Sequence, residues 1–307
     1  MCNVSIIYVN YKTSSLILDS IQTVKEKTKK VDYEIIVVDN NSGDQSRSKI
    51  QEAYPEVIWV QSDDNVGFGR ANNLGLQVAK GKCVLFLNPD TLLINDAISL
   101  LYHFIMSSSK IGVCGGNLFD EEGHPTNSFS RMYPSFLWEF LSIFYLSPVV
   151  FPHVRSYNFN FTKKPMKVAS VVGADLMVKR AVLDLVDGFD PRFFMNYEET
   201  ELCRRIRKKG FDIFSIPDAQ IIHLEGKASY IKQSRLSYLY EGQYIYFYKV
   251  YGYGGCLLIY LITQLKSYIR IIQFVLLANQ KRLGYWKMKL KTNRSIWDSI
   301  KQKGFKR

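Results

Sequence analysis

The N-terminal part of the chain alternates short apolar runs with segments in which apolar residues recur at helical spacing. The runs lack sustained polar alternation, which is typical of strands covered on both faces in a parallel sheet. They span Val4–Asn10, Tyr33–Asp39, Val57–Gln61 and Cys83–Leu87. After the first run, Leu16, Ile17, Ile21 and Val24 recur at helical spacing, with Thr13 as the N-cap. Further helices are predicted around Leu74 and Val78 and from Asn95 to Met106. Strands that alternate with helices predict parallel βαβ units and therefore an α/β fold.

The alternation is less regular in the next part of the chain. We expect strands at Ile111–Phe119, Val168–Val178, Ile213–Ile216 and Ala219–Ile222, a hairpin tip at Asp120–Pro125, and a helix at Phe193–Arg205 closed by Gly210. Between these elements, Phe136–Phe151 is an aromatic and aliphatic segment that Glu139 and Pro148 interrupt. It is too broken to span a bilayer, and we interpret it as a lid or as a membrane-facing surface.

The C-terminal tail, residues 230–307, differs from the rest of the chain in both pattern and charge. Residues 227–307 hold 16 Lys or Arg and two acids, whereas the first 226 residues hold 24 basic and 26 acidic side chains. The longest uncharged run, Val250–Leu265, has 16 residues and is short for a transmembrane helix. Apolar helices with interleaved basic residues, Tyr and Trp predict a tail that lies on an anionic membrane surface.

We therefore expect two domains, a body at residues 1–229 and a helical tail at 230–307. The five cysteines are widely spaced and mostly lie in apolar runs, which argues against a disulfide framework or a zinc site and indicates a reducing compartment. Met1 leads into Val4–Val9 without a basic segment, so we expect no signal peptide. These features predict a cytoplasmic protein that is peripheral on the inner face of the cell membrane.

Carboxylates follow two of the predicted strands. Asp39 ends the second strand, and Asp90 comes directly after Pro89, which cannot donate to a β-ladder and therefore ends the fourth strand. Open α/β sheets bind ligands at the carboxyl ends of their strands, so both side chains are expected at a ligand-binding edge. A carboxylate at such an edge can hold a cation.

Four motifs in this order resemble those of family 2 glycosyltransferases, most closely the rhamnosyltransferase-like bacterial branch. They are Val37–Ser42, Asn65–Gly75, Asn88–Asp90 and Tyr197–Cys203, and the resemblance runs from about Val4 to Ser229. It implies a GT-A fold, which is a Rossmann-like and mostly parallel sheet with helices on both faces. It also implies a nucleotide-sugar donor, a divalent metal (Mg or Mn) and inversion at the anomeric carbon.

The resemblance implies a set of residues that bind the nucleotide sugar. Asp39 would accept from the ring N–H of the base, and the segment Gly67–Asn73 would lie along the nucleotide, where glycines allow close approach and the helix start offers N–H groups to phosphate. The complete set is Val9, Asn10, Tyr11, Asp39, Gly67, Arg70, Asn73 and Asn88. The alternative for the glycine segment is a tight turn between strand and helix with capping amides.

The resemblance also implies a metal site. Asp90 matches the last acid of the family's Asp-x-Asp motif, and His223 stands where the family places a histidine near the metal and diphosphate. Asn88 replaces the first acid, so one carboxylate remains and the affinity for Mg²⁺ or Mn²⁺ is expected to be modest without substrate phosphates. The alternatives are an Asp90 that stabilises a turn or caps a helix and a His223 that is purely structural.

Glu199 occupies the position of the family's general base, with Glu198 in reserve. The family has Asp where this chain has Glu199, so the acid is one methylene longer. Glu199 also has capping-box spacing from Asn196, and in that alternative it would bond back to the Asn196 backbone. Glu201 and Arg205 have the spacing of an exposed i,i+4 ion pair.

The resulting hypothesis is an inverting glycosyltransferase that moves a sugar to a hydroxyl of a lipid-linked glycan for a bacterial surface polysaccharide. L-rhamnose from dTDP-rhamnose is the leading donor by resemblance. A noncatalytic, membrane-associated adaptor that binds nucleotide sugar is the alternative, since Asn88 and Glu199 both depart from the family pattern. A nucleic-acid partner is disfavoured because apolar residues separate the basic ones of the tail. The sequence does not indicate an oligomeric state.

Overall fold

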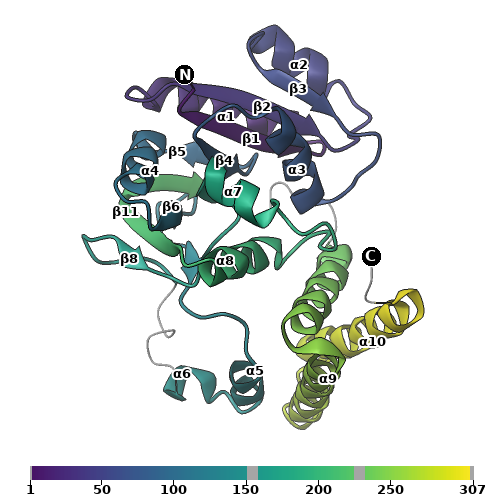
Figure 1. Ribbon diagram of the computed structural model, residues 1–307. Coiled ribbons are helices and arrows are strands. Elements are labelled where there is room, and N and C mark those ends of the chain that lie inside the picture. Colours follow the sequence, from purple (N-terminus) through teal and green to yellow (C-terminus); the bar gives the residue numbers. More distant parts are fainter. Residues whose placement is uncertain (1, 151–157, 225–231, 305–307) are drawn as a thin grey trace. The chain divides into compact units, whose positions relative to one another are not determined.

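The computed structural model describes residues 2–150, 158–224 and 232–304 (Figure 1). The chain forms two compact units, which we describe separately. Unit one comprises Met1–Tyr133, Ser156–Asp190 and Glu198–Ser229, and unit two comprises Pro134–Arg155, Pro191–Tyr197 and Tyr230–Arg307. The boundary expected at residue 229 lies outside the described residues, and two internal segments that we had placed in the body belong to unit two.

Unit one is built on a nine-stranded sheet with the order β3-β2-β1-β4-β10-β6-β11-β5, and β8 pairs with β11 off this path. Its first part contains β1 (Val4–Asn10), β2 (Tyr33–Asp39), β3 (Ile58–Gln61) and β4 (Cys83–Leu87), all parallel. Three of these strands have the predicted bounds, and β3 begins one residue later than expected. The βαβ prediction is confirmed for this part of the chain.

The remainder of the sheet is mixed. β10 (Asp175–Lys179) runs antiparallel to both β4 and β6 (Ile111–Phe119), while β11 (Asp212–His223) is parallel to β6. β5 (Thr91–Leu93) and β8 (Met166–Lys167) both pair antiparallel with β11. The description of the sheet as mostly parallel therefore holds for its first four strands and for the β6–β11 pair, and β10 separates these two parallel sets.

Helices cover both faces of the sheet, as predicted. They are α1 (Ser14–Lys27), α2 (Ser46–Ala53), α3 (Phe68–Val78), α4 (Ala97–Met106), α7 (Arg180–Val186) and α8 (Glu198–Lys208). The core is divided into two apolar clusters, with Ile6 in the cluster of α1 and α4 and Ile7 in the cluster of α3, α7 and α8. Successive residues of β1 thus point into opposite clusters, which explains why its apolar run shows no polar alternation.

Four local predictions need correction. Val168–Val178 is divided between β10 and a short strand β9 (Ser170–Val171), which pairs with β7 (Phe129–Ser130) in a separate sheet. The helix expected from Phe193 starts at Glu198, because Asn196 and Tyr197 have left-handed φ values of 69° and 70°. The two short strands before His223 form the single strand β11, with a register shift between Ser215 and Gln220. Thr13 precedes α1 without a capping bond, because its hydroxyl donates to Asn10 Oδ1.

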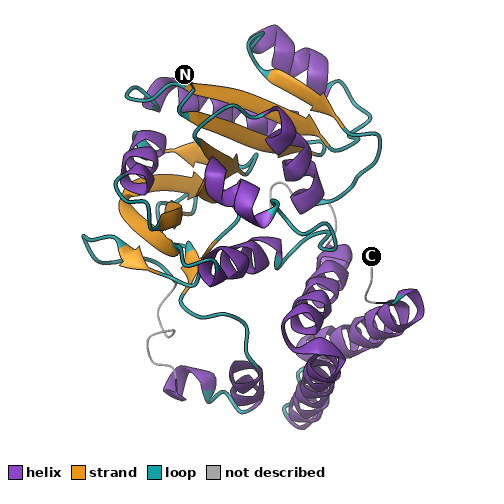
Figure 2. Ribbon diagram, in the orientation of Figure 1, coloured by secondary structure: helices purple, strands orange, loops and turns teal. Residues whose placement is uncertain are grey.

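Unit two contains only helices among its described residues (Figure 2). They are α5 (Phe136–Ile143), α6 (Ser147–Val150), α9 (Lys232–Leu276), which is interrupted at Gly252 with φ 72°, and α10 (Gln280–Lys303). Their core is aromatic and includes Phe193, Tyr244, Phe247 and Trp297. Part of α9, Ser234–Leu276, is long and apolar enough to cross a membrane by length and composition alone, and 44% of its most apolar window is buried.

Candidate active site

The carboxyl end of β4 brings together three of the predicted site residues. The Asn88 N–H donates to the Ala174 carbonyl oxygen at 2.9 Å, and the pairing of β5 with β11 places His223 opposite Thr91. As a result, His223 Nε2 lies 3.4 Å from Asp90 Oδ1 and 3.3 Å from Asn88 Nδ2. Residues 135 positions apart in the chain therefore meet at the edge where a ligand was expected.

The donor set of this edge fits a divalent metal. Asp90 is only 4% exposed, and its Oδ1 is buried without a hydrogen-bond partner among the described residues. A buried carboxylate oxygen that accepts no hydrogen bond is costly, and a cation bound beside His223 would compensate it. Mg²⁺ and Mn²⁺ favour oxygen donors such as this carboxylate, and Mn²⁺ tolerates an imidazole nitrogen better than Mg²⁺ does. The interpretation of Asp90 as a turn-stabilising carboxylate does not account for this oxygen. Asp90 and His223 are therefore the residues that would hold the ion.

Asp175 is a candidate that our sequence reading assigned to a strand without a role. It is the first residue of β10 and pairs with Leu87, the last residue of β4. Its Oδ2 accepts from the Gly116 N–H at 2.5 Å, while its Oδ1 is buried without a partner among the described residues. Burial raises the pKa of this carboxyl to about 7, although the Gly116 bond and the nearby charge of His223 act in the opposite direction. The signal in the sequence was a carboxylate within an apolar run.

We expect Asp175 to make folding stability depend on pH. Its pKa is raised on folding, so its contribution is fully present below the unfolded value of 3.8 and is lost as the pH rises through about 7. The loss is on the order of 4 kcal/mol. Urea unfolding in EDTA at pH 4 to 8 should show this contribution in the native protein, and the fall in stability over that range should be smaller by about this amount in Asp175→Asn, which keeps the contributions of Glu198 and Glu199. Equal slopes in the two proteins would contradict the assignment.

The Asp39 carboxylate is held by hydrogen bonds inside unit one. It accepts from Asn10 Nδ2 at 2.7 Å, from the Ser42 N–H at 3.1 Å and hydroxyl, and from Gln61 Nε2 at 2.9 Å. Asn10 also accepts from the Thr13 N–H and hydroxyl. Because an ionised carboxylate has about four lone-pair sites, a nucleobase would have to replace one of these donors. Gln61, which is exposed at the end of β3, is the donor most easily exchanged.

The predicted nucleotide loop before α3 is stabilised by amide side chains. Asn40 Nδ2 donates to Asn65 Oδ1 at 2.9 Å, and Asn40 Oδ1 accepts from the Val66 N–H at 2.9 Å. Gly67 has φ 86°, a left-handed conformation that favours glycine, and precedes the first turn of α3, which contains the half-buried Arg70. These amides bind the loop, whereas the Gly67 N-cap of α3 has no side-chain capping bond, so the turn of the alternative interpretation is present without its capping. Tyr11, after buried Val9 and Asn10, is 37% exposed.

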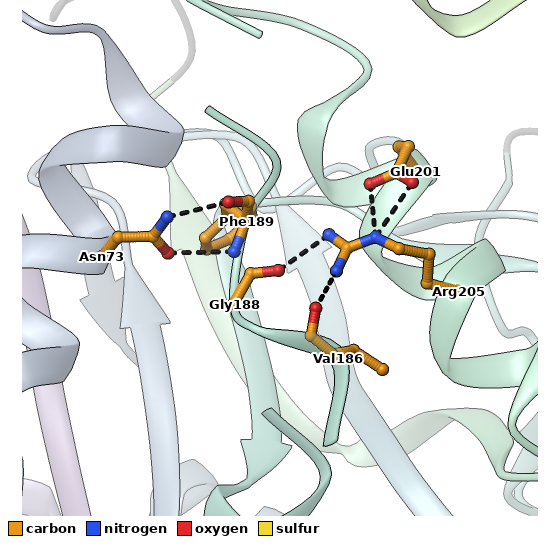
Figure 3. Close-up of polar contacts among 6 residues, drawn as sticks. All are labelled: Asn73, Val186, Gly188, Phe189, Glu201 and Arg205. Carbon is orange, nitrogen blue, oxygen red and sulfur yellow. Dashed lines mark hydrogen bonds and ion pairs between the residues drawn. The ribbon is translucent and has the colours of Figure 1, made fainter. Parts of the chain in front are cut away.

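Asn73 has a structural role in this fold. Its Nδ2 donates to the Phe189 carbonyl oxygen at 2.8 Å and its Oδ1 accepts from the Phe189 N–H at 2.9 Å, so both ends of the amide bind backbone 116 residues away (Figure 3). Gly188, before Phe189, has φ 59°, and a Cβ there would lie 2.6 Å from Asn73 Oδ1. We therefore do not retain Asn73 among the nucleotide-binding candidates.

Asn73→Ala should destabilise the protein without impairing donor binding. The substitution leaves one donor and one acceptor of the Phe189 backbone unpaired, at a cost of about 1–3 kcal/mol each where water does not replace the amide. Thermal unfolding should show a lower Tm, and titration with nucleotide below that Tm should show an unchanged Kd. A stable variant with weakened nucleotide binding would restore the original prediction.

The pair of Glu201 and Arg205 is a buried anchor, whereas we expected an exposed pair. Arg205 Nε donates to Glu201 Oε1 and Oε2 at 2.9 and 2.8 Å, and the Glu201 side chain is 3% exposed (Figure 3). The guanidinium also donates to the carbonyl oxygens of Val186 and Gly188. These bonds tie α8 to the turn after α7, so the first turn of α8, which contains Glu198 and Glu199, is held in place.

Glu198 and Glu199 differ in environment although they are adjacent. Burial and the charge of Glu199 raise the pKa of Glu198 well above its usual range, and Glu198 Oε2 has no hydrogen-bond partner among the described residues. Burial also raises the pKa of Glu199, but the N–H groups of Glu199 and Thr200 and the Thr200 hydroxyl oppose it. Glu199 thus has hydrogen-bond donors that favour its ionised form, whereas Glu198 has the charge of Glu199 beside it. In a capping box, Asn196 would be the N-cap and would have an extended backbone. Asn196 instead has a left-handed φ of 69°, and α8 begins at Glu198, so the capping-box alternative for Glu199 does not fit this helix start.

Glu199 lies close to the edge that carries Asn88 and Asp90. A Cβ built on Gly173 would lie 3.9 Å from Glu199 Cβ, and the next residue, Ala174, accepts the bond from Asn88. The turn Gly173–Ala174 therefore separates a carboxylate that can accept a proton from a donor set that can hold a metal and a diphosphate. A mixed α/β sheet with such an edge is the architecture of a glycosyltransferase.

Comparison with known proteins supports this class. Residues 5–165, more than half of the chain, match the family model for glycosyl transferase family 2, and the chain belongs to this family. It is 28% identical over 225 residues to the low-salt glycan biosynthesis hexosyltransferase of Haloferax volcanii, covering 72% of this chain and 67% of that protein. It is 28% identical over 206 residues to the rhamnosyltransferase WbbL of Escherichia coli, covering 62% of this chain and 72% of that protein.

A further relative is the N-acetylglucosaminyl-diphospho-decaprenol L-rhamnosyltransferase of Mycobacterium tuberculosis, which is 26% identical over 204 residues, 62% of this chain and 66% of that protein. Two solved structures have a TM-score of 0.58: GalNAc-T7 with UDP, GalNAc and Mn²⁺, and the mannosyltransferase PcManGT from Pyrobaculum calidifontis with GDP-Man and Mn²⁺. The GalNAc-T7 structure is 16% identical, and the match covers 82% of this chain and 50% of that chain. The PcManGT structure is 14% identical, and the match covers 98% of this chain and 76% of that chain. This similarity confirms the predicted GT-A fold.

Proposed function

We propose that the protein is an inverting glycosyltransferase that moves a sugar from a nucleotide-sugar donor to a hydroxyl of a lipid-linked glycan. The observation that carries the proposal is the buried Asp90 Oδ1, which accepts no hydrogen bond among the described residues and lies 3.4 Å from His223 Nε2, on the other side of the Gly173–Ala174 turn from Glu199. Direct displacement requires a carboxylate that can hold a metal beside the leaving group and a base that can take the proton of the acceptor hydroxyl. No covalent intermediate on the protein is needed.

In this mechanism Glu199 takes the proton of the acceptor hydroxyl as that oxygen attacks the anomeric carbon. Its carboxylate is oriented by N–H groups at the start of α8, and Glu198 is the poorer base because burial beside Glu199 keeps it protonated. A divalent ion bound by Asp90 and His223 would neutralise charge on the departing diphosphate. Asn88 contributes an amide to the same edge, and Arg70 and Gly67 are proposed to lie along the nucleotide.

The particular donor and acceptor are inferred from relatives. Two of the proteins described above are named rhamnosyltransferases, one of them for a lipid diphosphate acceptor, so we propose L-rhamnose from dTDP-rhamnose and synthesis of a surface polysaccharide. Membrane association is inferred from the 16 basic residues between 227 and 307 and from exposed apolar side chains of α9. The proposed location is the cytoplasmic face of the cell membrane.

A donor panel tests this function. Purified protein is incubated with dTDP-, UDP- and GDP-sugars and Mg²⁺ or Mn²⁺, and both Tm and release of nucleoside diphosphate are measured with and without a lipid-linked acceptor. One donor should raise Tm by saturating the site, since a ligand at 100 times its Kd adds about 2.7 kcal/mol. The same donor should release its diphosphate when acceptor is present. Binding without release across the panel would instead indicate the noncatalytic adaptor.

A further inference from the structure

Unit two contains a pocket of about 450 Å³ that is separate from the residues considered above. It lies between the end of α5, the last turns of α9 and the start of α10. Its lining includes Ser142, Tyr145, Lys266, Arg270, Arg282 and Trp286. Three of these six side chains are cationic, and the lining contains no acid. The nearest described carboxylate is that of Glu139, whose Oε2 lies 3.6 Å from Lys266 Nζ.

The cations of the pocket are held in position. Arg270 stacks on Tyr145, with its Cζ 3.5 Å from the ring centroid, and donates to the Ser142 carbonyl oxygen at 3.0 Å and to Gln273 Oε1 at 2.9 Å. These bonds use two of the five N–H donors of the guanidinium, so part of its donor edge is left for a ligand. Lys266 Nζ donates to Ser142 Oγ at 2.7 Å. A preorganised guanidinium fork beside an ammonium suits the oxygens of a phosphate.

Two other features favour an anion. Arg282 is in the first turn of α10, a helix of 24 residues whose N-terminal N–H groups add positive potential. Burial lowers the pKa of Lys266, as expected for an ammonium that is poorly solvated and only partly compensated by Glu139. Glu139 is the only acid among the described residues of 134–150, and α9 and α10 contribute only Glu241 and Asp298. The charge of the pocket is therefore not balanced within unit two.

Exposed apolar side chains are close in sequence to residues that line the pocket. Phe140 and Phe144 flank the Ser142 and Tyr145 positions and are 45% and 51% exposed, and Leu276, two residues after the lining residue Phe274, is 81% exposed. Exposed apolar side chains on the segments that also supply a cationic pocket, with Tyr and Trp in its wall, are typical of a protein surface at the level of lipid headgroups.

We propose that this pocket binds the phosphate or diphosphate headgroup of a membrane lipid, with the lipid chain lying against exposed apolar side chains of unit two. The proposal rests on the membrane association included in the proposed function and specifies how that association is achieved. General charge attraction brings the basic tail to the membrane, and the pocket then selects lipids whose headgroup exposes phosphate oxygens.

The test is vesicle co-sedimentation of the full-length protein with two lipid mixtures of matched surface potential. One contains phosphatidylcholine with phosphatidic acid, and the other contains phosphatidylcholine with phosphatidylserine. The native protein should bind the phosphatidic acid vesicles at least about tenfold more tightly, because charge-assisted bonds to a terminal phosphate add to general attraction. Arg282→Gln should lose this preference. Lys281→Gln removes the same charge at an exposed neighbouring position outside the pocket lining and should keep it.

Three results would overturn the proposal. The first is equal binding of the native protein to both vesicles, and the second is an equal loss in Arg282→Gln and Lys281→Gln. In the third, inorganic pyrophosphate raises the Tm of the native protein but not of Arg282→Gln, without displacing it from vesicles, which would assign the pocket to a free anion. The donor panel is run on the same proteins. Failure of donor binding contradicts the proposed function, whereas failure of lipid selection with intact donor binding contradicts only this inference.

Discussion

Asp90→Ala is expected to abolish sugar transfer while the protein remains folded. Asp90 supplies the buried oxygen that has no hydrogen-bond partner among the described residues, and it lies beyond the end of β4, outside both apolar clusters. This oxygen accepts no hydrogen bond, and the substitution removes only its 3.4 Å contact with His223 Nε2, so Tm should change little. Without the metal, however, the negative charge on the leaving diphosphate would no longer be neutralised. Activity should drop by a factor on the order of 10³ or more, since such electrostatic stabilisation is a large term in catalysis.

The measurement is release of nucleoside diphosphate in the presence of acceptor over a range of Mn²⁺ and Mg²⁺ concentrations. Asp19→Ala serves as the control, because Asp19 is an exposed acid on α1 and its loss should leave the rate unchanged. Tm of the native protein should rise with Mn²⁺ and donor together, and that rise should vanish in Asp90→Ala. Full activity of the variant, or undiminished activity of the native protein in excess EDTA, would exclude the metal role.

Glu199→Gln is expected to lower kcat by a factor on the order of 10² to 10⁴ while Tm and donor Kd stay nearly unchanged. The amide can still accept from the N–H groups of Glu199 and Thr200, so the start of α8 keeps its bonds. It cannot take a proton from the acceptor. Glu198→Gln should have a much smaller effect on kcat, since burial beside Glu199 already keeps that carboxyl protonated.

Single-turnover transfer with saturating donor and acceptor separates these outcomes, and Tm of each variant reports on folding. If Glu198→Gln loses turnover and Glu199→Gln does not, the base is the preceding residue. If both variants turn over normally, the base lies elsewhere and the match of this helix to the family motif is wrong. A large fall in Tm for Glu199→Gln would indicate that the residue mainly stabilises the helix start.

The local pattern of apolar residues was sufficient to predict many of the strands of unit one. β1, β2, β4 and β6 have the predicted bounds because an apolar run with a turn former at its end reports burial on both faces, which is a local property. The placement of Asp90 after Pro89 followed from the same reasoning. The motifs around Asp39, Gly67 and Asp90 indicated the family that the family model then confirmed.

Other features depended on contacts between distant residues. Asp175 reaches the site because β10 inserts antiparallel between β4 and β6, and no local signal specifies that order. Asn73 resembled a nucleotide ligand in the motif, but its amide is bound to backbone 116 residues away. The start of α8 at Glu198 is determined by the left-handed backbone of Asn196 and Tyr197, which helical periodicity did not reveal.

The sequence by itself thus determined the class of fold, the strands with strong apolar runs, the glycosyltransferase family and the position of Asp90 at a ligand edge. The tertiary structure alone decided that Asp90 meets His223, that Asp175 is next to this edge, and that residues 134–150 join the basic tail to form a cationic pocket. The physical reason is that periodicity and turn chemistry act within a few residues. Strand order, buried polar partners and pocket walls come from the free energy of contacts between segments that lie far apart in the chain.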